Sequence, residues 1–172
     1  MNIKKIVLVV GFAGCMQGAQ AHEVNPHAES LCTADEVVVA ACFIKGAPQK
    51  VLSVCSSGPK AKKNQVAYRF GTRKKTEMSY LVDGSDKEKR MYRGTYVGAS
   101  NQTTLYWFKK GVYTYKVAIP GTGVGHLSVL KSDKLILSKD CTSNVLGDVE
   151  AKNNLFVEKS ADETFEMWNK GE

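Results

Sequence analysis

The strongest constraint on the fold of this chain is a series of short segments rich in β-branched and aromatic residues, each bounded by turn-forming residues. Several of them alternate apolar with polar side chains, as a strand with one buried face does. Nine such segments are present, at residues 37–44, 51–55, 65–70, 77–82, 93–97, 103–108, 112–119, 126–131 and 134–138. We therefore expect an all-β fold, a single antiparallel barrel or sandwich of about eight to nine short strands.

The C-terminal tail has a different pattern. Ser160 and Glu163 have the spacing of a capping box, in which each side chain satisfies a free amide at the start of a helix. This spacing predicts a short C-terminal helix whose Phe165 and Trp168 lie on the sheet. A final strand in which Phe165 alternates with Met167 is the alternative.

The N-terminus has the features of a secretory leader. Two lysines precede an apolar run at residues 6–16, and a small-residue cleavage segment ends at Ala21. The run is shorter than the roughly 20 apolar residues that a membrane-spanning helix needs. We expect residues 1–21 to be a signal peptide and residues 22–172 to be one disulfide-bonded β domain, periplasmic or secreted.

An alternative processing route runs through Cys15. Residues 12–15, Phe-Ala-Gly-Cys, resemble a lipoprotein processing box, in which the cysteine becomes the lipid-bearing first residue. The protein would then be an outer-membrane lipoprotein. We expect contact with a membrane only by this route.

The expected mature domain keeps four cysteines, an even number in an oxidising compartment, so two disulfides are expected. Their spacings contain no Cys-x-x-Cys pair. A zinc ribbon or a thioredoxin-like redox centre therefore has no support. The four residues are Cys32, Cys42, Cys55 and Cys141.

Hairpin geometry ranks the three possible pairings of these cysteines. If the first two expected strands pair around the Gly/Pro turn between them, Ala40 lies opposite Cys55. Cys32 can then fold back toward the same end, which favours a Cys32–Cys55 bond. The remaining bond, Cys42–Cys141, would join the last expected strand to the first.

Basic residues outnumber acidic ones. The chain has 24 Lys and Arg against 17 Asp and Glu, a net charge of +7, and loss of the two leader lysines leaves 22 against 17, or +5. Residues 60–93 hold 11 basic and 4 acidic side chains, whereas residues 140–172 hold 3 and 8. The favoured interpretation is a solvated face of strand edges, where lysines block edge-to-edge association. The alternative is that this polarity steers an acidic partner toward residues 60–93, if those side chains lie together in the fold. Nucleic acid is not an expected partner, because an exported protein meets little of it.

Two basic groups are the candidate partner contacts. An exposed tryptophan flanked by lysines is typical of an interface hot spot. Packing of that tryptophan in the core is nevertheless the default expectation, since neighbouring residues of a strand face opposite sides of the sheet and one set can be covered by the tail helix. The candidates are Arg73, Lys74 and Lys75 in one expected turn, and Trp107, Lys109 and Lys110 at the end of an aromatic run.

Catalysis is not expected. The chain has no Gly-x-Ser-x-Gly motif, its mature cysteines are expected to be oxidised, and its carboxylate pairs fall in turns and in the helix cap. The glycine-rich segment at 121–125 lacks the Lys-Ser/Thr of a phosphate-binding loop, so it is expected to be a hairpin connection. Neither a catalytic residue nor a cofactor is predicted. One metal hypothesis remains, in which cleavage exposes the amine and imidazole of His22 and these, with His27, hold copper.

A set of segments spans much of the chain: VVVAAC at 37–42, VLSVC at 51–55, YRFG at 68–71, WFKKGVYTYKV at 107–117 and a last hairpin ending in Cys141. This set resembles a group of exported proteobacterial β-rich proteins with four cysteines. The resemblance implies an envelope β-protein and carries over no functional residue. WFKKG at 107–111 is also similar to a strand of the small barrel inhibitors of c-type lysozyme, whose Ser-x-Gly-x-x-Tyr element this chain lacks.

Together these features favour a non-enzymatic binding protein of the cell envelope. Another protein is the expected partner, and the expected role is inhibition of, or immunity against, an enzyme or toxin that degrades the envelope. A lysozyme is a poor candidate for that target, because it is cationic and would repel a basic inhibitor. Binding of copper or of a small molecule is the alternative function.

Overall fold

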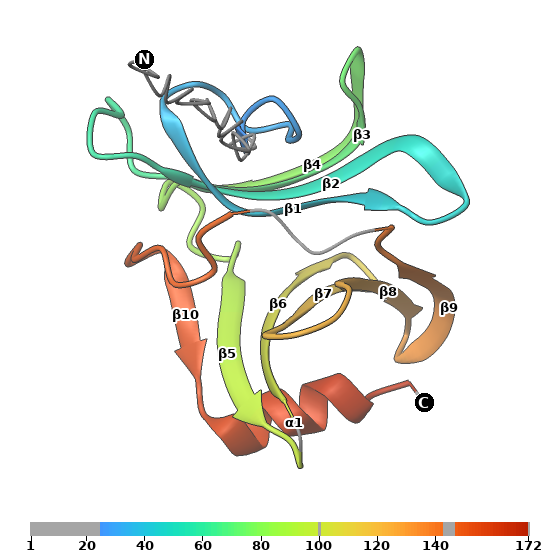
Figure 1. Ribbon diagram of the computed structural model, residues 1–172. Helices are drawn as coiled ribbons and strands as arrows, with labels where there is room; N and C mark the ends of the chain where they lie inside the picture. The colour runs from blue at the N-terminus through green and yellow to red at the C-terminus, as the bar shows by residue number, and fades with distance from the viewer. Residues whose placement is uncertain (1–24, 100, 143–146, 172) are drawn as a thin grey trace, which may run out of the picture.

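The computed structural model describes residues 25–99, 101–142 and 147–171. The expected leader, with Cys15, and His22 lie outside these residues. The described chain is mostly β and forms two sheets, with one short helix near the C-terminus (Figure 1). The all-β expectation is therefore confirmed. The described strands do not close into a barrel, and the two sheets instead face one another as in a sandwich.

The first sheet has four antiparallel strands in sequence order. They are β1 (Glu36–Ile44), β2 (Ala47–Ser57), β3 (Val66–Thr72) and β4 (Lys75–Val82). The second sheet has six strands. In spatial order they are β10 (Phe156–Lys159), β5 (Met91–Val97), β6 (Gln102–Lys110), β7 (Tyr113–Pro120), β8 (His126–Lys131) and β9 (Lys134–Asp140).

All nine expected strands are present, and β10 is an additional strand that the sequence pattern did not predict. It pairs in parallel with β5, from Phe156 opposite Met91 to Lys159 opposite Gly94. Phe156 is its one buried residue, so the segment has too little alternation to identify it as a strand.

The main core lies between the two sheets. Alternate side chains of each strand point inward, as the pleat requires. The first sheet contributes Val39, Leu52, Val54, Tyr68 and Tyr80, and the second contributes Tyr106, Phe108, Val117, Leu127 and Val129.

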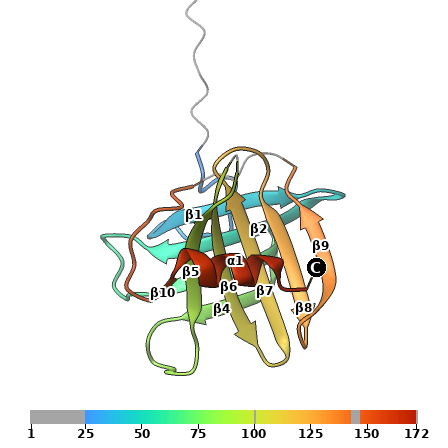
Figure 2. The ribbon, with the colours of Figure 1, turned by 90° about the horizontal axis from the view of Figure 1, so that it is seen from below.

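The helix α1 (Ala161–Asn169) covers the outer face of the second sheet, where it crosses the strands (Figure 2). The expected capping box is confirmed: the amide of Glu163 donates to Oγ of Ser160 over 3.3 Å, and the amide of Ser160 donates to the Glu163 carboxylate over 3.1 Å. Gly94 of β5 makes close docking possible, because a Cβ there would lie 1.9 Å from Oγ1 of the fully buried Thr164.

The two sheets are joined at one corner. Ile44 and Cys141 form an isolated bridge, and the amide of Lys45 donates to the carbonyl of Asp140 over 2.8 Å. The disulfide Cys42–Cys141 crosses the same corner. The structure thus has the two pairings that hairpin geometry favoured, Cys42–Cys141 and Cys32–Cys55.

The register of the first hairpin differs from the expected one, in which Ala40 lies opposite Cys55. Ala40 lies opposite Val54, in the same register as Cys42 opposite Leu52, and Cys55 lies opposite Val38 after a register shift between Val38 and Ala40. A bulge adds one residue to a strand and offsets every pair beyond it. Cys32 reaches Cys55 all the same, because the chain before β1 folds back over β2, where the amide of Leu31 donates to Oγ of Ser53.

Candidate functional site

An apolar groove opens between the two sheets where β3 and β4 face β7, β8 and β9. Its volume is about 280 Å³, close to the roughly 300 Å³ at which small-molecule sites begin. Every side chain that lines it is aromatic or aliphatic. They are Tyr68 and Phe70 of β3, Met78 of β4, Tyr113 and Tyr115 of β7, Leu127 and Val129 of β8, and Ile136 and Leu137 of β9.

Stacked aromatic rings lie behind the groove and connect the sheets. The ring centroid of Phe108 is 4.9 Å from that of Tyr115 on the neighbouring strand and 4.1 Å from that of Tyr80 in the opposite sheet. Tyr68 completes the group at 5.1 Å from Phe108. Aromatic pairs at these separations are stabilising beyond their buried area. The groove therefore has a rigid wall on its inner side.

The outer side of the groove is open and apolar. Ile136 and Leu137 of the edge strand β9 are 52% and 37% exposed. Large exposed aliphatic side chains beside a hollow are typical of ligand or partner sites. The apolar surface of the groove thus continues onto the molecular surface.

A row of lysines crosses one end of the groove. In the strand register Lys110 lies opposite Tyr113, Tyr113 opposite Lys131, and Lys131 opposite Lys134. Residues paired in register share a face of the sheet, and Tyr113 lines the groove. The side chains of these three lysines are therefore on the groove side of the sheet. All three lysines are exposed, and none has an ion pair with another residue of the described ranges. The apolar groove therefore ends in a positively charged rim.

Tight turns place two of these lysines. Ser132 and Asp133 connect β8 to β9 with φ angles of 48° and 68°. Two consecutive positive φ values are the signature of a type I′ turn, which joins strands with matching twist. Lys131 and Lys134 consequently sit at the two ends of the turn, directly opposite one another.

Tyr68 adds a polar group to the groove. Its side chain is 2% exposed, and its hydroxyl makes no hydrogen bond with any residue in the described part of the chain. Burial, with a smaller contribution from Tyr115, raises the pKa of the Tyr68 hydroxyl above its ordinary value. Burial also raises the pKa of Tyr115. Both groups therefore remain neutral at physiological pH, where each can donate a hydrogen bond.

The turn candidates Arg73 and Lys74 line a separate hollow of about 300 Å³ at the tips of the first two hairpins. The guanidinium of Arg73 lies 5.6 Å from the ring centroid of Phe43, and it pairs with Glu29 over 2.7 Å. Lys75 is exposed at the start of β4. These three residues thus gather at one end of the first sheet, apart from Lys109 and Lys110 in the second.

Trp107 was named as a candidate partner contact, and this assignment is wrong because its side chain is buried. It is 4% exposed and lies under α1, stacked on Tyr92 with ring centroids 5.5 Å apart. The helix buries it because β6 points Tyr106 and Phe108 to the main core and Trp107 to the opposite face. Its side chain is therefore not part of the exposed basic surface.

The basic segment 60–93 does not act as one exposed patch. Arg69 forms a buried ion pair with Glu36, and Arg93 donates through Nε to Glu158 over 3.0 Å. These two cations form ion pairs within the fold, so the exposed positive charge of the segment comes from its lysines, Arg73 and Arg90. The charge difference between residues 60–93 and 140–172 is thus partly cancelled in the fold, where Arg93 of the first segment pairs with Glu158 of the second.

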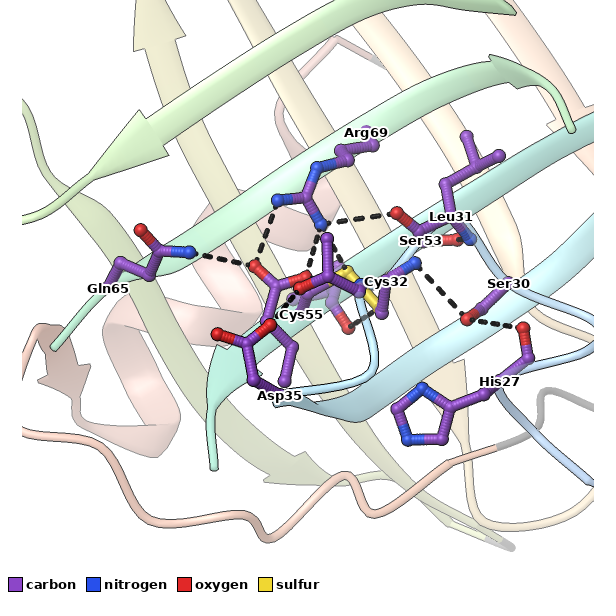
Figure 3. Close-up of a disulfide and its surroundings, with 12 residues drawn as sticks. His27, Ser30, Leu31, Cys32, Asp35, Ser53, Cys55, Gln65 and Arg69 are labelled. Atoms are coloured by element: carbon purple, nitrogen blue, oxygen red, sulfur yellow. Dashed lines mark hydrogen bonds and ion pairs between the residues drawn. A yellow bond between two sulfur atoms is a disulfide. The ribbon is translucent and has the colours of Figure 1, made fainter. Parts of the chain in front are cut away.

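The Glu36–Arg69 pair lies against the Cys32–Cys55 disulfide (Figure 3). Arg69 donates to both Glu36 oxygens, over 2.6 and 2.9 Å, and Gln65 donates to the same carboxylate over 3.0 Å. The sulfur atoms of the two cysteines and the carboxylate of Glu36 lie within 4.8 Å of one another. They do not form a metal site, because both sulfurs are in the disulfide and the carboxylate is held by Arg69.

Comparison with family models, curated proteins and solved structures finds no match to this chain. Function is therefore inferred from the geometry of the molecule. The described residues include no helix with the length and apolarity required to span a lipid bilayer.

Sequence reasoning identified Lys110 but missed the other two lysines of the rim and the groove itself. Lys131 and Lys134 are ordinary turn-flanking residues in the sequence. Their relation to Tyr113 arises from the pairing of β7 with β8 and of β8 with β9. The available signal was the two-residue gap between the expected strands at 126–131 and 134–138, since a two-residue hairpin turn places its flanking residues opposite one another.

Proposed function

We propose that this protein is a binding protein of the cell envelope, whose ligand is an amphiphile with one acyl chain and an anionic head group. The acyl chain would lie in the groove between the sheets, and the head group would meet the lysine rim. The observation that carries the proposal is the row of three lysines in register with Tyr113 at the end of an otherwise apolar groove.

The chemistry of the groove supports this class of ligand. An acyl chain replaces water along aromatic and aliphatic side chains, and burial of its surface contributes about 25 cal/mol per Å². The ammonium groups of Lys131 and Lys134 attract a carboxylate or phosphate at the mouth. The hydroxyl of Tyr68 offers a hydrogen-bond donor close to the chain.

Titration calorimetry with dodecanoate and dodecanol tests the proposal, since the two differ in head-group charge and share the same chain. Dodecanoate is expected to bind more tightly. A Lys131→Ala, Lys134→Ala double variant is expected to weaken dodecanoate binding by about fivefold and to leave dodecanol binding unchanged, because two exposed charges contribute roughly 1 kcal/mol.

The matched control is a Lys87→Ala, Lys152→Ala double variant, which removes the same charge from exposed positions away from the groove. Its affinity for dodecanoate is expected to equal that of the wild type. Equal weakening in both double variants would mean that net charge alone acts, and absence of dodecanoate binding to the wild type would refute the proposal.

A protein partner is a second candidate function, favoured by the hollow at the hairpin tips. Phe43, Arg73 and Lys74 combine an aromatic ring with two cations there. Such a site suits an acidic side chain of a partner, for example an envelope-degrading enzyme or toxin that this protein would inhibit. For a partner identified by cross-linking, Arg73→Glu with Lys74→Glu should abolish binding, and Lys87→Glu should leave it intact.

A further inference from the structure

Ser138, His126 and Asp140 form a hydrogen-bonded chain on the outer face of β8 and β9. Nδ1 of His126 lies 2.8 Å from Oδ1 of Asp140, and Nε2 of the same ring lies 3.1 Å from Oγ of Ser138. The register explains the arrangement, because Asp140 is directly opposite His126 and Ser138 is two residues earlier on β9. Positions two apart on a strand share a face. The site is therefore on the side of the sheet opposite the groove.

This order of groups is that of an activated nucleophile. A serine hydroxyl is a weak nucleophile unless a base removes its proton, and the base must lie within hydrogen-bond reach. His126 meets this condition for Ser138. Asp140 accepts the hydrogen bond from Nδ1, which favours the tautomer whose Nε2 is free to accept the serine proton.

A cavity of about 390 Å³ gives access to these three residues. The C-terminal end of α1 forms its far wall, where the ring of Trp168 meets the ring of His126 edge-on at 6.4 Å. Val124 and Leu135 also line the cavity, so part of its surface is apolar. The side chain of His126 is 26% exposed, which leaves the imidazole accessible from solvent.

A buried cation borders the cavity. Lys116 is 4% exposed, and its ammonium donates to the carbonyls of Met167, Trp168 and Lys170 at the end of α1, over 3.2, 3.0 and 2.8 Å. The helix carbonyls hold this charge in place on the cavity lining. A fixed positive charge stabilises negative charge that develops on a substrate oxygen.

We propose that Ser138 is the nucleophile of an acyl-transfer site that hydrolyses carboxylic esters. Oγ of Ser138 forms a bond to the ester carbonyl carbon while its proton passes to Nε2 of His126, and the carbonyl π electrons move to the oxygen. Collapse of this tetrahedral intermediate breaks the bond to the alcohol oxygen, which takes the proton from Nε2. Water then attacks the acyl carbon while its proton passes to Nε2 of His126, and collapse of this second tetrahedral intermediate breaks the bond to Oγ of Ser138. Oγ takes the proton back from Nε2, and the carboxylic acid leaves. This activity is separate from ligand binding in the groove.

Reaction with p-nitrophenyl acetate tests the site. The wild-type protein is expected to release p-nitrophenolate and to carry one acetyl group on Ser138, located by mass spectrometry of its peptides. Ser138→Ala should lose both signals. His126→Gln should slow acylation by about 10²-fold or more, the usual contribution of a general base. Asp140→Asn should also slow it, because the ring then loses the carboxylate that orients it.

Ser79→Ala is the matched control, since Ser79 is an exposed serine on β4, an edge strand of the other sheet. It should react at the wild-type rate. A fluorophosphonate probe on the wild-type protein gives a second readout that needs no variant, and it should label Ser138. Acetylation of lysines alone, absence of the fluorophosphonate label at Ser138, or an unchanged rate in His126→Gln would each overturn the proposal.

Discussion

At the scale of single residues, the buried Glu36–Arg69 pair has the largest consequence for stability. The side chain of Glu36 is 1% exposed and that of Arg69 is 16% exposed, so neither charge is well solvated. Burial acts to raise the pKa of Glu36, but the hydrogen bonds from Arg69 and Thr33, together with the charge of Arg69, outweigh it and lower that pKa. The carboxylate is therefore held in its charged form.

Glu36→Gln is expected to lower the free energy of unfolding by about 3 kcal/mol at pH 7, because it leaves the Arg69 charge without a counter-ion. Urea unfolding measures the difference. Glu77→Gln is the control, since the Glu77–Lys50 pair lies at the surface and should contribute less than about 1 kcal/mol. Similar losses in the two variants would contradict the distinction between buried and exposed pairs.

The same pair predicts the direction of a pH effect. A carboxylate whose pKa is lower in the folded than in the unfolded protein stabilises the fold above its ordinary pKa of 4.5, and this contribution disappears as the pH falls through the lowered value. The stability difference between wild type and Glu36→Gln should therefore be full at pH 7 and shrink below pH 4.5. Urea midpoints at pH 7, 4.5 and 3 measure it, and a difference that grew in acid would contradict this sign.

At the scale of elements, the two disulfides and the contact of α1 with β5 decide how the strands are held. Cys42–Cys141 closes a sequence separation of 99 residues across the corner between the sheets, whereas Cys32–Cys55 closes 23. Gly94 lets Thr164 approach the sheet closely. Each contact can be removed on its own, so each gives a prediction.

Removal of the longer disulfide is expected to cost more than removal of the shorter one. In the chain-entropy model Cys42→Ala with Cys141→Ala lowers the free energy of unfolding by about 4 to 5 kcal/mol, and Cys32→Ala with Cys55→Ala by about 3 kcal/mol. Urea unfolding without reductant compares them. A larger loss from the shorter loop would show that local contacts, and not loop closure, dominate.

Gly94→Ala is expected to loosen α1 from the sheet, because the new methyl group would overlap Oγ1 of Thr164. Overpacking of this kind costs about 1–3 kcal/mol. The near-ultraviolet circular dichroism of the tryptophans should weaken as the helix moves from Trp107, and the melting temperature should fall. Gly98→Ala is the control, since the nearest atom to its new Cβ is at an ordinary 3.5 Å. A wild-type spectrum in Gly94→Ala would contradict the proposed contact.

At the scale of the whole molecule, the two sheets meet at one corner and part where the groove opens. The corner is held by Cys42–Cys141 and the bridge at Ile44, and the groove is lined by β3, β4 and β7–β9. A ligand that enters the groove contacts both sheets. Its binding should therefore stabilise the complete fold.

Dodecanoate is expected to raise the melting temperature of the wild-type protein, because binding to the native state alone adds about 2.7 kcal/mol at a free concentration of 100 times Kd. Differential scanning calorimetry in the presence of the ligand measures the shift. At the same concentration the Lys131→Ala, Lys134→Ala variant should show a smaller rise. An equal rise with dodecanol would show that the chain alone, without the head group, drives binding.

Much of the fold could be predicted from the sequence because its signals are local. The alternation within 65–70 and 77–82 marks the strands β3 and β4, and the pair Ser160 and Glu163 marks the start of α1. The segment Phe156–Lys159 carries no such pattern, because its pairing with β5 depends on a partner more than 60 residues away.

The candidate sites depend almost entirely on pairing between strands. Sequence reasoning placed Trp107 on an exposed surface as one possibility, and α1 covers it. It also found no nucleophile with a base, because Ser138 and His126 are 12 residues apart and belong to no known motif. Their contact exists only once β8 and β9 are in register.

The sequence by itself determined the strand segments, the capped helix, the expectation of two disulfides and the excess of positive charge, since each depends on the period of apolar side chains, on cysteine number or on composition. Only the tertiary structure decided that the strands form two sheets, that an apolar groove with a lysine rim opens between them, and that Ser138, His126 and Asp140 align. The physical reason is that hydrogen bonds between strands bring together residues far apart in the chain, and a shift of one residue in that pairing turns every following side chain to the other face.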